Sequence, residues 1–140
     1  RSFLDHNRIY KDIEKTSPTR NFKSTGAYSY KGRYLNSENI ALNLINHFQL
    51  WKDHISKHGL LLLELHGLDL QLSQENISLT PTIAYESTHG YSDQYIVEYD
   101  FFLQCAMTAG LEKIDKFSKV FPSKEITTIS LNIFKYLIFL

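Results

Sequence analysis

The sequence predicts an α/β fold, and the hydrophobic patterns of four segments carry this prediction. Apolar residues recur every three or four positions over Glu38–Lys57, which predicts an amphipathic helix. The run Leu60–Leu65 is apolar almost throughout and too short for a helix, as is typical of a buried parallel strand. Two β-like segments, Leu111–Phe121 and Glu125–Phe139, follow near the end and are split by Pro122–Lys124, which predicts a hairpin.

Capping and stop residues set the expected ends of the helices. Asn36 or Ser37 is expected to cap the first helix, because their side chains accept hydrogen bonds from first-turn N–H groups. Gly59 is placed to end this helix in the left-handed conformation that favours glycine. A second long helix is expected over Tyr95–Ala109, with Gly110 at its stop position.

The remaining segments give weaker signals. Thr16–Tyr34 holds proline and glycine among Ser, Thr and Tyr, and is interpreted as an ordered loop or a ragged hairpin. Asp69–Asn76 is expected to form a short helix. From Thr127 to Ile133, apolar and polar residues alternate with the period of a half-buried strand.

The composition fits one globular domain and argues against several classes of function. The chain has 140 residues, is 43% hydrophobic and carries a formal net charge of zero, so no global field attracts nucleic acid or an anionic membrane. Cys105 is the only cysteine, which excludes an internal disulfide, and is expected to be a buried structural thiol. The apolar tail Ile133–Leu140 is too short to span a bilayer, which takes about 20 residues. We therefore expect a cytoplasmic protein.

The densest group of chemically capable side chains lies in Thr88–Tyr95. It places an imidazole, a carboxylate, a carboxamide and two phenols around Gly90. His66 directly follows the strand Leu60–Leu65. Because ligands of open α/β sheets bind beyond the carboxyl ends of parallel strands, His66 and His89 are expected to lie in one cleft.

Each of these residues also has a structural interpretation. His66 is a candidate metal ligand or general base, or a histidine that bonds a neighbouring loop. Glu64 lies in a buried strand and must find a partner or lose its charge, so a structural pairing and a ligand role both stay open. The alternative for His89 is a helix-entry loop, in which Ser92 or Asp93 caps the helix expected from Tyr95.

The first residues of the chain are interpreted as the end of a strand and the loop that follows it. Asp5, His6 and Arg8 would then lie at the carboxyl edge of the sheet. The forked guanidinium of Arg8 is suited to grip a carboxylate such as a malonyl group. A solvated cluster that anchors the loop is the alternative.

Several stretches resemble methyltransferases that accompany polyketide synthases, and among these the apratoxin-type, metal-dependent domains. They are Phe3–Arg8, Gly26–Tyr28, Ala41–Leu44 with His47, Phe48 and Trp51, Gly59–His66 and Thr88–Tyr95. The order of the elements likewise resembles the C-terminal half of a class I S-adenosylmethionine-dependent methyltransferase. That Rossmann-like sheet ends in an antiparallel pair, with the final strand inserted beside the fifth.

The resemblance implies a metal site and a substrate site. The implied ligands of a divalent metal such as iron or manganese are His89, Gln94 and His66. The implied substrate-binding residues are Asp5, Arg8 and Tyr91, for a small carboxylate or an acyl group tethered to a carrier protein. The metal would polarise the acyl carbonyl as a Lewis acid, and His66 or His6 would take an α-proton before methylation.

The resemblance also implies that part of the domain is missing. Class I enzymes hold S-adenosylmethionine at a glycine-rich turn, whereas the glycines here are scattered, at positions 26, 32, 59, 67, 90 and 110. We expect residues 1–140 to be one partial domain that starts just after the fourth strand and lacks the cofactor-binding half. Leu60–Leu65 would then expose one face and one edge, and the chain would dimerise through that edge or precipitate.

Two other functions remain open. The chain is alternatively a non-catalytic remnant or recognition module that complements a separate cofactor-binding chain. A metal-dependent hydrolase built on the loop of His89 and Gln94 would need no S-adenosylmethionine.

Overall fold

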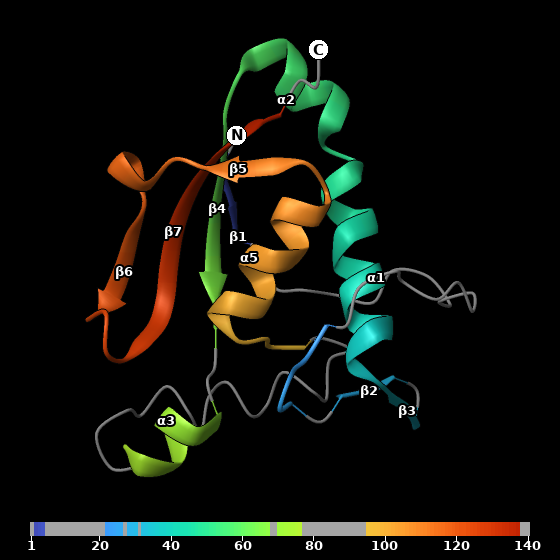
Figure 1. Ribbon diagram of the computed structural model, residues 1–140, viewed down its shortest axis with the longest axis vertical. Coiled ribbons are helices and arrows are strands. Elements are labelled where there is room, and N and C mark those ends of the chain that lie inside the picture. The colour runs from blue at the N-terminus through green and yellow to red at the C-terminus, as the bar shows by residue number, and fades with distance from the viewer. Residues whose placement is uncertain are drawn as a thin grey trace.

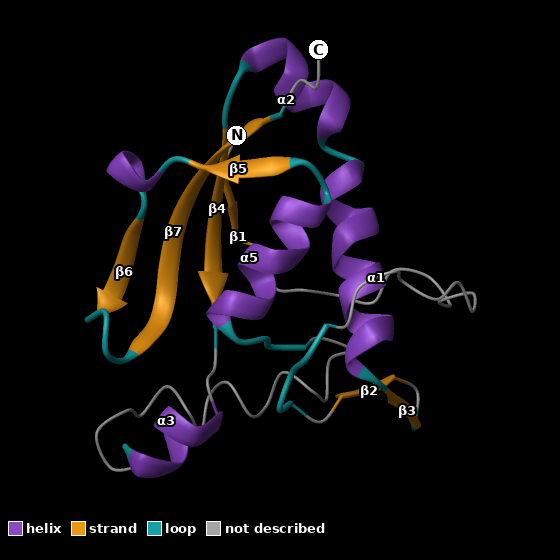
Figure 2. Ribbon diagram, viewed as in Figure 1, coloured by secondary structure: helices purple, strands orange, loops and turns teal. Residues whose placement is uncertain are grey.

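The computed structural model describes residues 2–4, 22–26, 28–30, 32–67, 70–76 and 95–137, and shows mixed helices and strands (Figures 1 and 2). The strands are β1 (Ser2–Leu4), β2 (Tyr28–Tyr30), β3 (Arg33–Leu35), β4 (Leu61–His66), β5 (Leu111–Lys113), β6 (Lys119–Pro122) and β7 (Thr127–Tyr136). The helices are α1 (Ser37–Gln49), α2 (Lys52–His58), α3 (Leu70–Glu75), α5 (Tyr99–Thr108) and the 3₁₀ turn η2 (Asp115–Phe117). The predicted α/β class is confirmed.

The described strands form a five-stranded sheet and a separate hairpin of β2 and β3. In the sheet, β1, β4, β7 and β5 are neighbours in that order, and β6 also pairs with β7. β1 runs parallel to β4, whereas β7 runs antiparallel to β4, β5 and β6. The expected insertion of the final strand beside the apolar strand is therefore confirmed.

Both edges of β4 are occupied, so the expectation that this strand exposes an edge is wrong. Phe3 pairs with Leu63 on one side and Asn132 pairs with Leu63 on the other. The short strand β1 takes the position that we expected to be empty, which fits the interpretation of the chain start as the exit from a strand. Among the described strands of this sheet, β1 has an unpaired edge on one side, and β5 and β6 have unpaired edges on the other.

α1 and α5 pack on the same face of the sheet and enclose the core (Figure 1). The ring of Phe102 on α5 lies between Phe48 of α1, at 5.4 Å, and Phe134 of β7, at 6.0 Å, both in edge contact. Leu61, Leu63 and Leu65 of β4 are each 1% exposed beneath them. Burying one such side chain contributes about 1.5–3 kcal/mol.

The predicted helix ends are largely confirmed. Asn36 caps α1 through a reciprocal pair of bonds with Asn39, in which each side chain accepts from the other residue's backbone N–H. Gly59 (φ 86°) ends α2 and Gly110 (φ 89°) follows α5, both in the region that favours glycine. The single helix expected over Glu38–Lys57 is instead two helices. Between them, the backbone N–H groups of Leu50 and Trp51 bond the carbonyl three residues earlier, as in a 3₁₀ turn.

The second long helix begins at Tyr99, four residues later than predicted. Residues 95–98 are extended, with Tyr95 and Val97 buried, and the N-cap is Glu98 rather than Ser92 or Asp93. Tyr95 is held in this conformation by its hydroxyl, which donates to the Asn43 side chain at 3.1 Å. The face of α5 that lies in the core carries Phe101, Phe102, Cys105 and Ala106, whereas Met107 is 58% exposed.

The C-terminal strands differ from the prediction in two ways. The segment Leu111–Phe121 is broken into β5 and β6 by η2. In β7 it is the polar set of the alternation that faces the helices, with Ser130 and Asn132 at most 1% exposed. The apolar set, Ile129, Leu131 and Ile133, lies on the opposite face and is half-buried. Within the described residues, no helix is long and apolar enough to cross a membrane.

Candidate functional site

The carboxyl ends of β1 and β4 lie at the end of the sheet where α5 begins (Figure 1). Gly67, just after β4, makes this close approach possible, because a side chain there would meet the Val97 carbonyl oxygen at 3.3 Å from its Cβ. The Gly67 N–H donates to the Thr128 carbonyl at 2.9 Å. The end of β4, the start of α5 and the start of β7 are thus held together at the edge where open α/β sheets bind ligands.

His66 is the predicted site residue that the structure describes. It is the last residue of β4, and its Nε2 lies 3.3 Å from Glu64 Oε1. The side chains are 20% and 32% exposed, respectively, so both are accessible to solvent. Because they are two residues apart on a strand, they share the sheet face that turns away from the buried leucines of β4.

The pair answers the question of how Glu64 is accommodated. The carboxylate finds its partner in His66, which favours the pairing expected for a charge in a strand. Directly across the sheet, Ile129 pairs with His66 and Phe121 pairs with Ile129. Phe121 is 45% exposed, so an apolar row leads from the edge of the sheet to the imidazole.

The other predicted site residues lie outside the described part of the chain. They are Asp5, His6, Arg8, Tyr91, His89 and Gln94. Within the described residues, no group of three or more His, Cys, Asp or Glu side chains is close enough to hold a metal ion. The catalytic, metal-binding and substrate-binding roles of these six residues therefore stay predictions.

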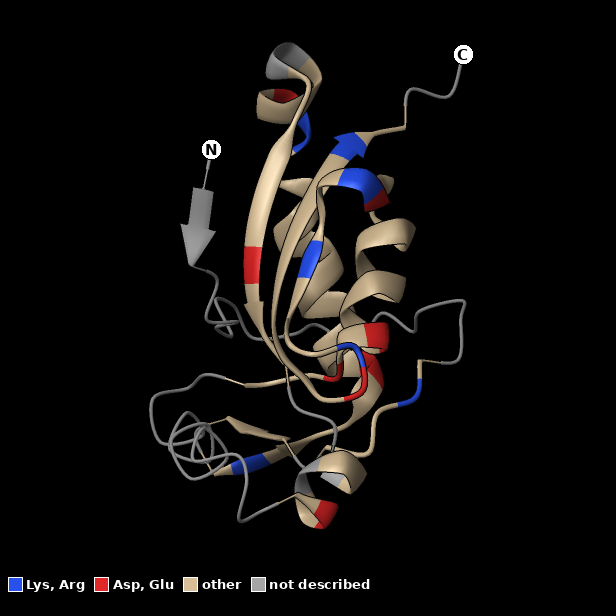
Figure 3. Cartoon of the chain, turned by 90° about the vertical axis from the view of Figure 1, so that its left-hand side faces the viewer, with Lys and Arg blue, Asp and Glu red and all other residues tan. Residues whose placement is uncertain are grey.

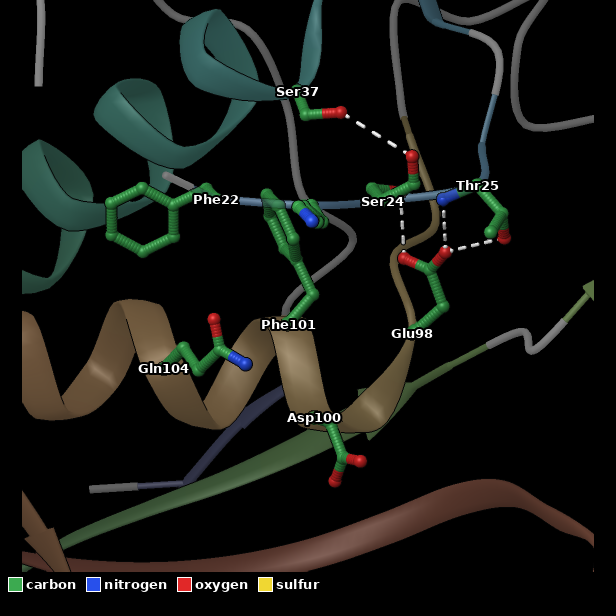
Figure 4. Close-up of a pocket in the computed structure, with 9 residues that line it drawn as sticks. Phe22, Ser24, Thr25, Ser37, Glu98, Asp100, Phe101 and Gln104 are labelled. Atoms are coloured by element: carbon green, nitrogen blue, oxygen red, sulfur yellow. Dashed lines mark hydrogen bonds between the residues drawn. The ribbon is translucent and has the colours of Figure 1, made fainter. Parts of the chain in front are cut away.

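A second group of polar side chains, which sequence reasoning missed, surrounds Glu98 (Figure 4). Its Oε2 accepts from the Ser24 hydroxyl at 2.7 Å, and its Oε1 accepts from both the backbone N–H and the hydroxyl of Thr25 at 2.7 Å. Burial raises the pKa of the Glu98 carboxyl, but these hydrogen bonds outweigh burial and hold the pKa below its ordinary value. Glu98 is therefore anionic at neutral pH.

The Glu98 contacts fasten the segment 22–26 and the following hairpin to the core. The Tyr28 hydroxyl hydrogen-bonds the Ser24 hydroxyl, and the Tyr28 ring meets the Tyr95 ring edge-on at 6.0 Å. Burial raises the pKa of Tyr28 to about 12, with the nearby Glu98 charge adding to the effect of burial. Tyr28 is therefore a neutral anchor of the hairpin.

An open pocket of about 530 Å³ lies beside this clamp, between the segment 22–25 and the first turns of α1 and α5. The apolar wall is formed by Phe22 and Phe101, whose rings are in edge contact at 6.1 Å. The polar lining residues are Lys23, Ser24, Thr25, Ser37, Glu98, Asp100 and Gln104. In Figure 4 the Asp100 carboxylate points away from the Glu98 clamp.

A third polar group lies under α5, on the helix-covered face of the sheet. Tyr99 donates from its hydroxyl to the Asn132 side chain at 2.9 Å, and Asn132 donates to Ser130 at 2.8 Å. Lys113 donates to the Tyr99 hydroxyl at 3.2 Å and pairs with Asp115 at 2.9 Å. Burial lowers the pKa of Lys113, but its bonds to Asp115 and Tyr99 outweigh burial and raise it. This network satisfies the polar residues that β7 places in the core.

Neither a cluster of like charges nor a reactive thiol marks a further candidate site among the described residues. Lys, Arg, Asp and Glu side chains are interspersed along the described elements rather than gathered by sign (Figure 3). Cys105 is fully buried, and burial raises the pKa of its thiol to about 12, so it has the character of the structural thiol that we expected.

Comparison with known proteins agrees with the topology. Residues 1–132 match the protein family described as the AprA MT2-like domain, in the methyltransferase group Methyltransf_36. The match covers nearly the whole chain, including the described elements through most of β7. A search of curated proteins found no match.

Proposed function

The chain belongs to the family of AprA MT2-like domains, and from this we propose that it is the substrate-handling part of an S-adenosylmethionine-dependent methyltransferase. The proposed substrate is a small carboxylate or an acyl group tethered to a carrier protein. Within the described residues, the observation that supports this role most directly is the pair of His66 and Glu64 at the carboxyl end of β4.

We assign His66 the removal of the α-proton of the acyl substrate. Histidine suits a general base because its ordinary pKa lies near neutral pH. On taking the proton the imidazole becomes a cation, and the Glu64 carboxylate at 3.3 Å stabilises that cation. The apolar residues Ile129 and Phe121 beside His66 would pack against an acyl chain. His6, outside the described residues, is the alternative base.

The described residues do not by themselves fit the methyl donor. S-adenosylmethionine supplies an electrophilic methyl group, and class I enzymes hold it at a glycine-rich turn. The six glycines of this chain are scattered, and those described serve helix ends, a hairpin turn, the clamped segment 22–26 and the close approach of Gly67. We therefore propose that a glycine-rich cofactor-binding unit, in the same protein or in a partner, completes the enzyme.

The proposed metal also needs residues beyond the described part. A carboxylate and an imidazole suit a divalent metal, but Glu64 and His66 are two groups, whereas a protein metal site generally takes three or more. His89 and Gln94 are the proposed further ligands, and with a metal bound to them His66 is either the third ligand, with His6 as the base, or the uncoordinated base, because a coordinated imidazole nitrogen does not accept a proton. A metal bound there would polarise the acyl carbonyl and make the α-proton more acidic.

Exchange of the α-proton tests the role of His66 without a methyl donor. In D₂O, a malonyl or propionyl thioester should lose its α-proton signal faster with the chain than without it, as followed by proton NMR. His66→Gln should lower this rate by about a hundredfold or more, in the range for removal of a general base. His54→Gln, at an exposed histidine of α2, is the control and should leave the rate unchanged.

A recognition module without catalysis is the second candidate, favoured by the scattered glycines. It predicts that the chain binds the thioester but exchanges no α-proton, with or without added Fe²⁺ or Mn²⁺. Titration calorimetry with S-adenosylmethionine completes the test. We expect no measurable heat with this chain and binding with a longer chain that carries a glycine-rich turn.

A further inference from the structure

The Glu98 carboxylate is a charge that lines a pocket and has no counter-ion among the described residues. It is half-buried, and its three hydrogen-bond donors, one from Ser24 and two from Thr25, are all neutral. Lys23 lines the same pocket but forms no ion pair with Glu98, and no other Lys, Arg or His of the described residues does so. Neutral hydrogen-bond donors stabilise this carboxylate, and a cation beside it would add a stronger, charge-assisted bond.

The geometry leaves room for one more donor on this carboxylate. Two carboxylate oxygens offer about four acceptor positions. Thr25 donates twice to Oε1, whereas Oε2 accepts the single bond from Ser24, so Oε2 is the oxygen with room for a further donor. Phe22 and Phe101 form an apolar wall beside the carboxylate (Figure 4). The Gln104 side chain at the mouth has no hydrogen-bond partner among the described residues. The pocket volume of about 530 Å³ lies within the range of small-molecule sites.

We propose that this pocket binds a small organic ammonium ion with an apolar body, whose N–H groups donate to Glu98 and whose body packs against Phe22 and Phe101. The site is separate from the pair of Glu64 and His66. Glu98 lies on the side of the sheet where α1 and α5 pack, and His66 points to the other face. The proposal therefore does not depend on the assigned methyltransferase chemistry.

A purely structural clamp is the competing explanation, because the N-terminus of a helix such as α5 also favours a negative charge. The two explanations predict different selectivity of the pocket between a charged and a neutral ligand of the same shape. An ammonium site prefers 2-phenylethylammonium over 2-phenylethanol, which has nearly the same shape and no charge. A structural clamp binds neither, or binds both equally through the apolar wall.

Titration of the ¹⁵N-labelled full chain with both probes decides between them. We expect the ammonium ion to shift the amide signals of residues 23–25 and 98–104, and to bind about tenfold or more tightly than the alcohol, as a charge-assisted hydrogen bond implies. Glu98→Gln should remove this preference. Glu112→Gln is the matched control, since that exposed carboxylate of β5 lies outside the pocket lining, and should keep the preference.

Gln104 provides a second test that does not disturb the clamp. The residue is exposed, so Gln104→Glu and Gln104→Lys should both fold. Gln104→Glu should tighten ammonium binding and Gln104→Lys should weaken it, each by about threefold, with no effect on the alcohol. Equal affinity for the two probes, no binding of the ammonium ion, or an insensitivity to both Gln104 substitutions would overturn the proposal.

Discussion

The two faces of the central sheet are made by the same strands but have opposite character. On the face under α1 and α5, Leu63 of β4 and its neighbour Asn132 of β7 are at most 1% exposed. On the other face, Leu62 and its neighbour Ile133 are only half-buried. A fully polar side chain is thus better shielded from water than an isoleucine one position further along the same strand.

The difference shows that the covering helices decide burial in this sheet, rather than the hydrophobic pattern of each strand. Asn132 is tolerated in the core because Tyr99 of α5 donates to it and Ser130 accepts from it. The face turned away from α1 and α5 instead carries the titratable pair of Glu64 and His66. The shielded face supplies stability, and the proposed chemistry uses the accessible face.

Truncating one leucine on each face is the most direct way to break this comparison. Leu63→Ala should lower the free energy of unfolding by about 2–5 kcal/mol, because it leaves a cavity under the helices. Leu62→Ala, on the half-buried face, should cost about 1 kcal/mol or less, since its surroundings are already partly solvated. Urea denaturation followed by circular dichroism measures both. Equal losses would mean that the two faces are equally packed.

Removing one hydroxyl tests whether Asn132 is stable in the core only through its partner. Tyr99→Phe should cost about 1–3 kcal/mol, because the buried Asn132 carbonyl oxygen loses its donor. Tyr34→Phe removes the same atom from a residue that is 75% exposed, and should change stability by less than about 0.5 kcal/mol. If both variants melt like the wild type, the Tyr99 network does not contribute to the core.

Local signals were sufficient to predict one part of this fold. The N-cap at Asn36, one of the two residues predicted for it, the glycine stops at Gly59 and Gly110 and the strand predicted over Leu60–Leu65 and found at Leu61–His66 all depend on residues close together in sequence. The position of His66 at the carboxyl end of its strand followed from the same local pattern.

Interactions between distant residues explain what the sequence did not predict. Glu98 is held by Ser24 and Thr25, more than 70 positions away, and has extended backbone angles at the N-cap of α5. In the same way, the polar face of β7 lies in the core because Tyr99 donates a hydrogen bond to Asn132. No periodicity within a single segment predicts either of these contacts. The position of Glu98 just before a helix start is a local signal that could have drawn attention to it.

Acid should weaken the Glu98 clamp, which attaches the segment 22–26 to the helix-covered side. Because the folded pKa of Glu98 lies below its ordinary value, the clamp contributes fully above that ordinary pKa and is lost as pH falls through the folded value. Glu98→Gln should therefore lower the melting temperature at pH 7 and have a smaller effect at pH 3. Asp100→Asn, for which no hydrogen-bonded partner is described, is the control. A constant difference between wild type and Glu98→Gln from pH 7 to pH 3 would contradict this assignment.

The pair of Glu64 and His66 is where we expect the smallest effect on stability and the largest effect on the proposed α-proton exchange. Glu64→Gln removes a partly exposed ion pair with His66, so it should change the free energy of unfolding by about 1 kcal/mol or less. The rate of α-proton exchange should nevertheless fall, because the imidazolium that forms on His66 loses its stabilising charge. Glu112→Gln removes an exposed pair with Lys135 at 2.8 Å and serves as the control for a charge change alone. A Glu64→Gln variant with an unchanged exchange rate would show that the accessible face is not the catalytic one.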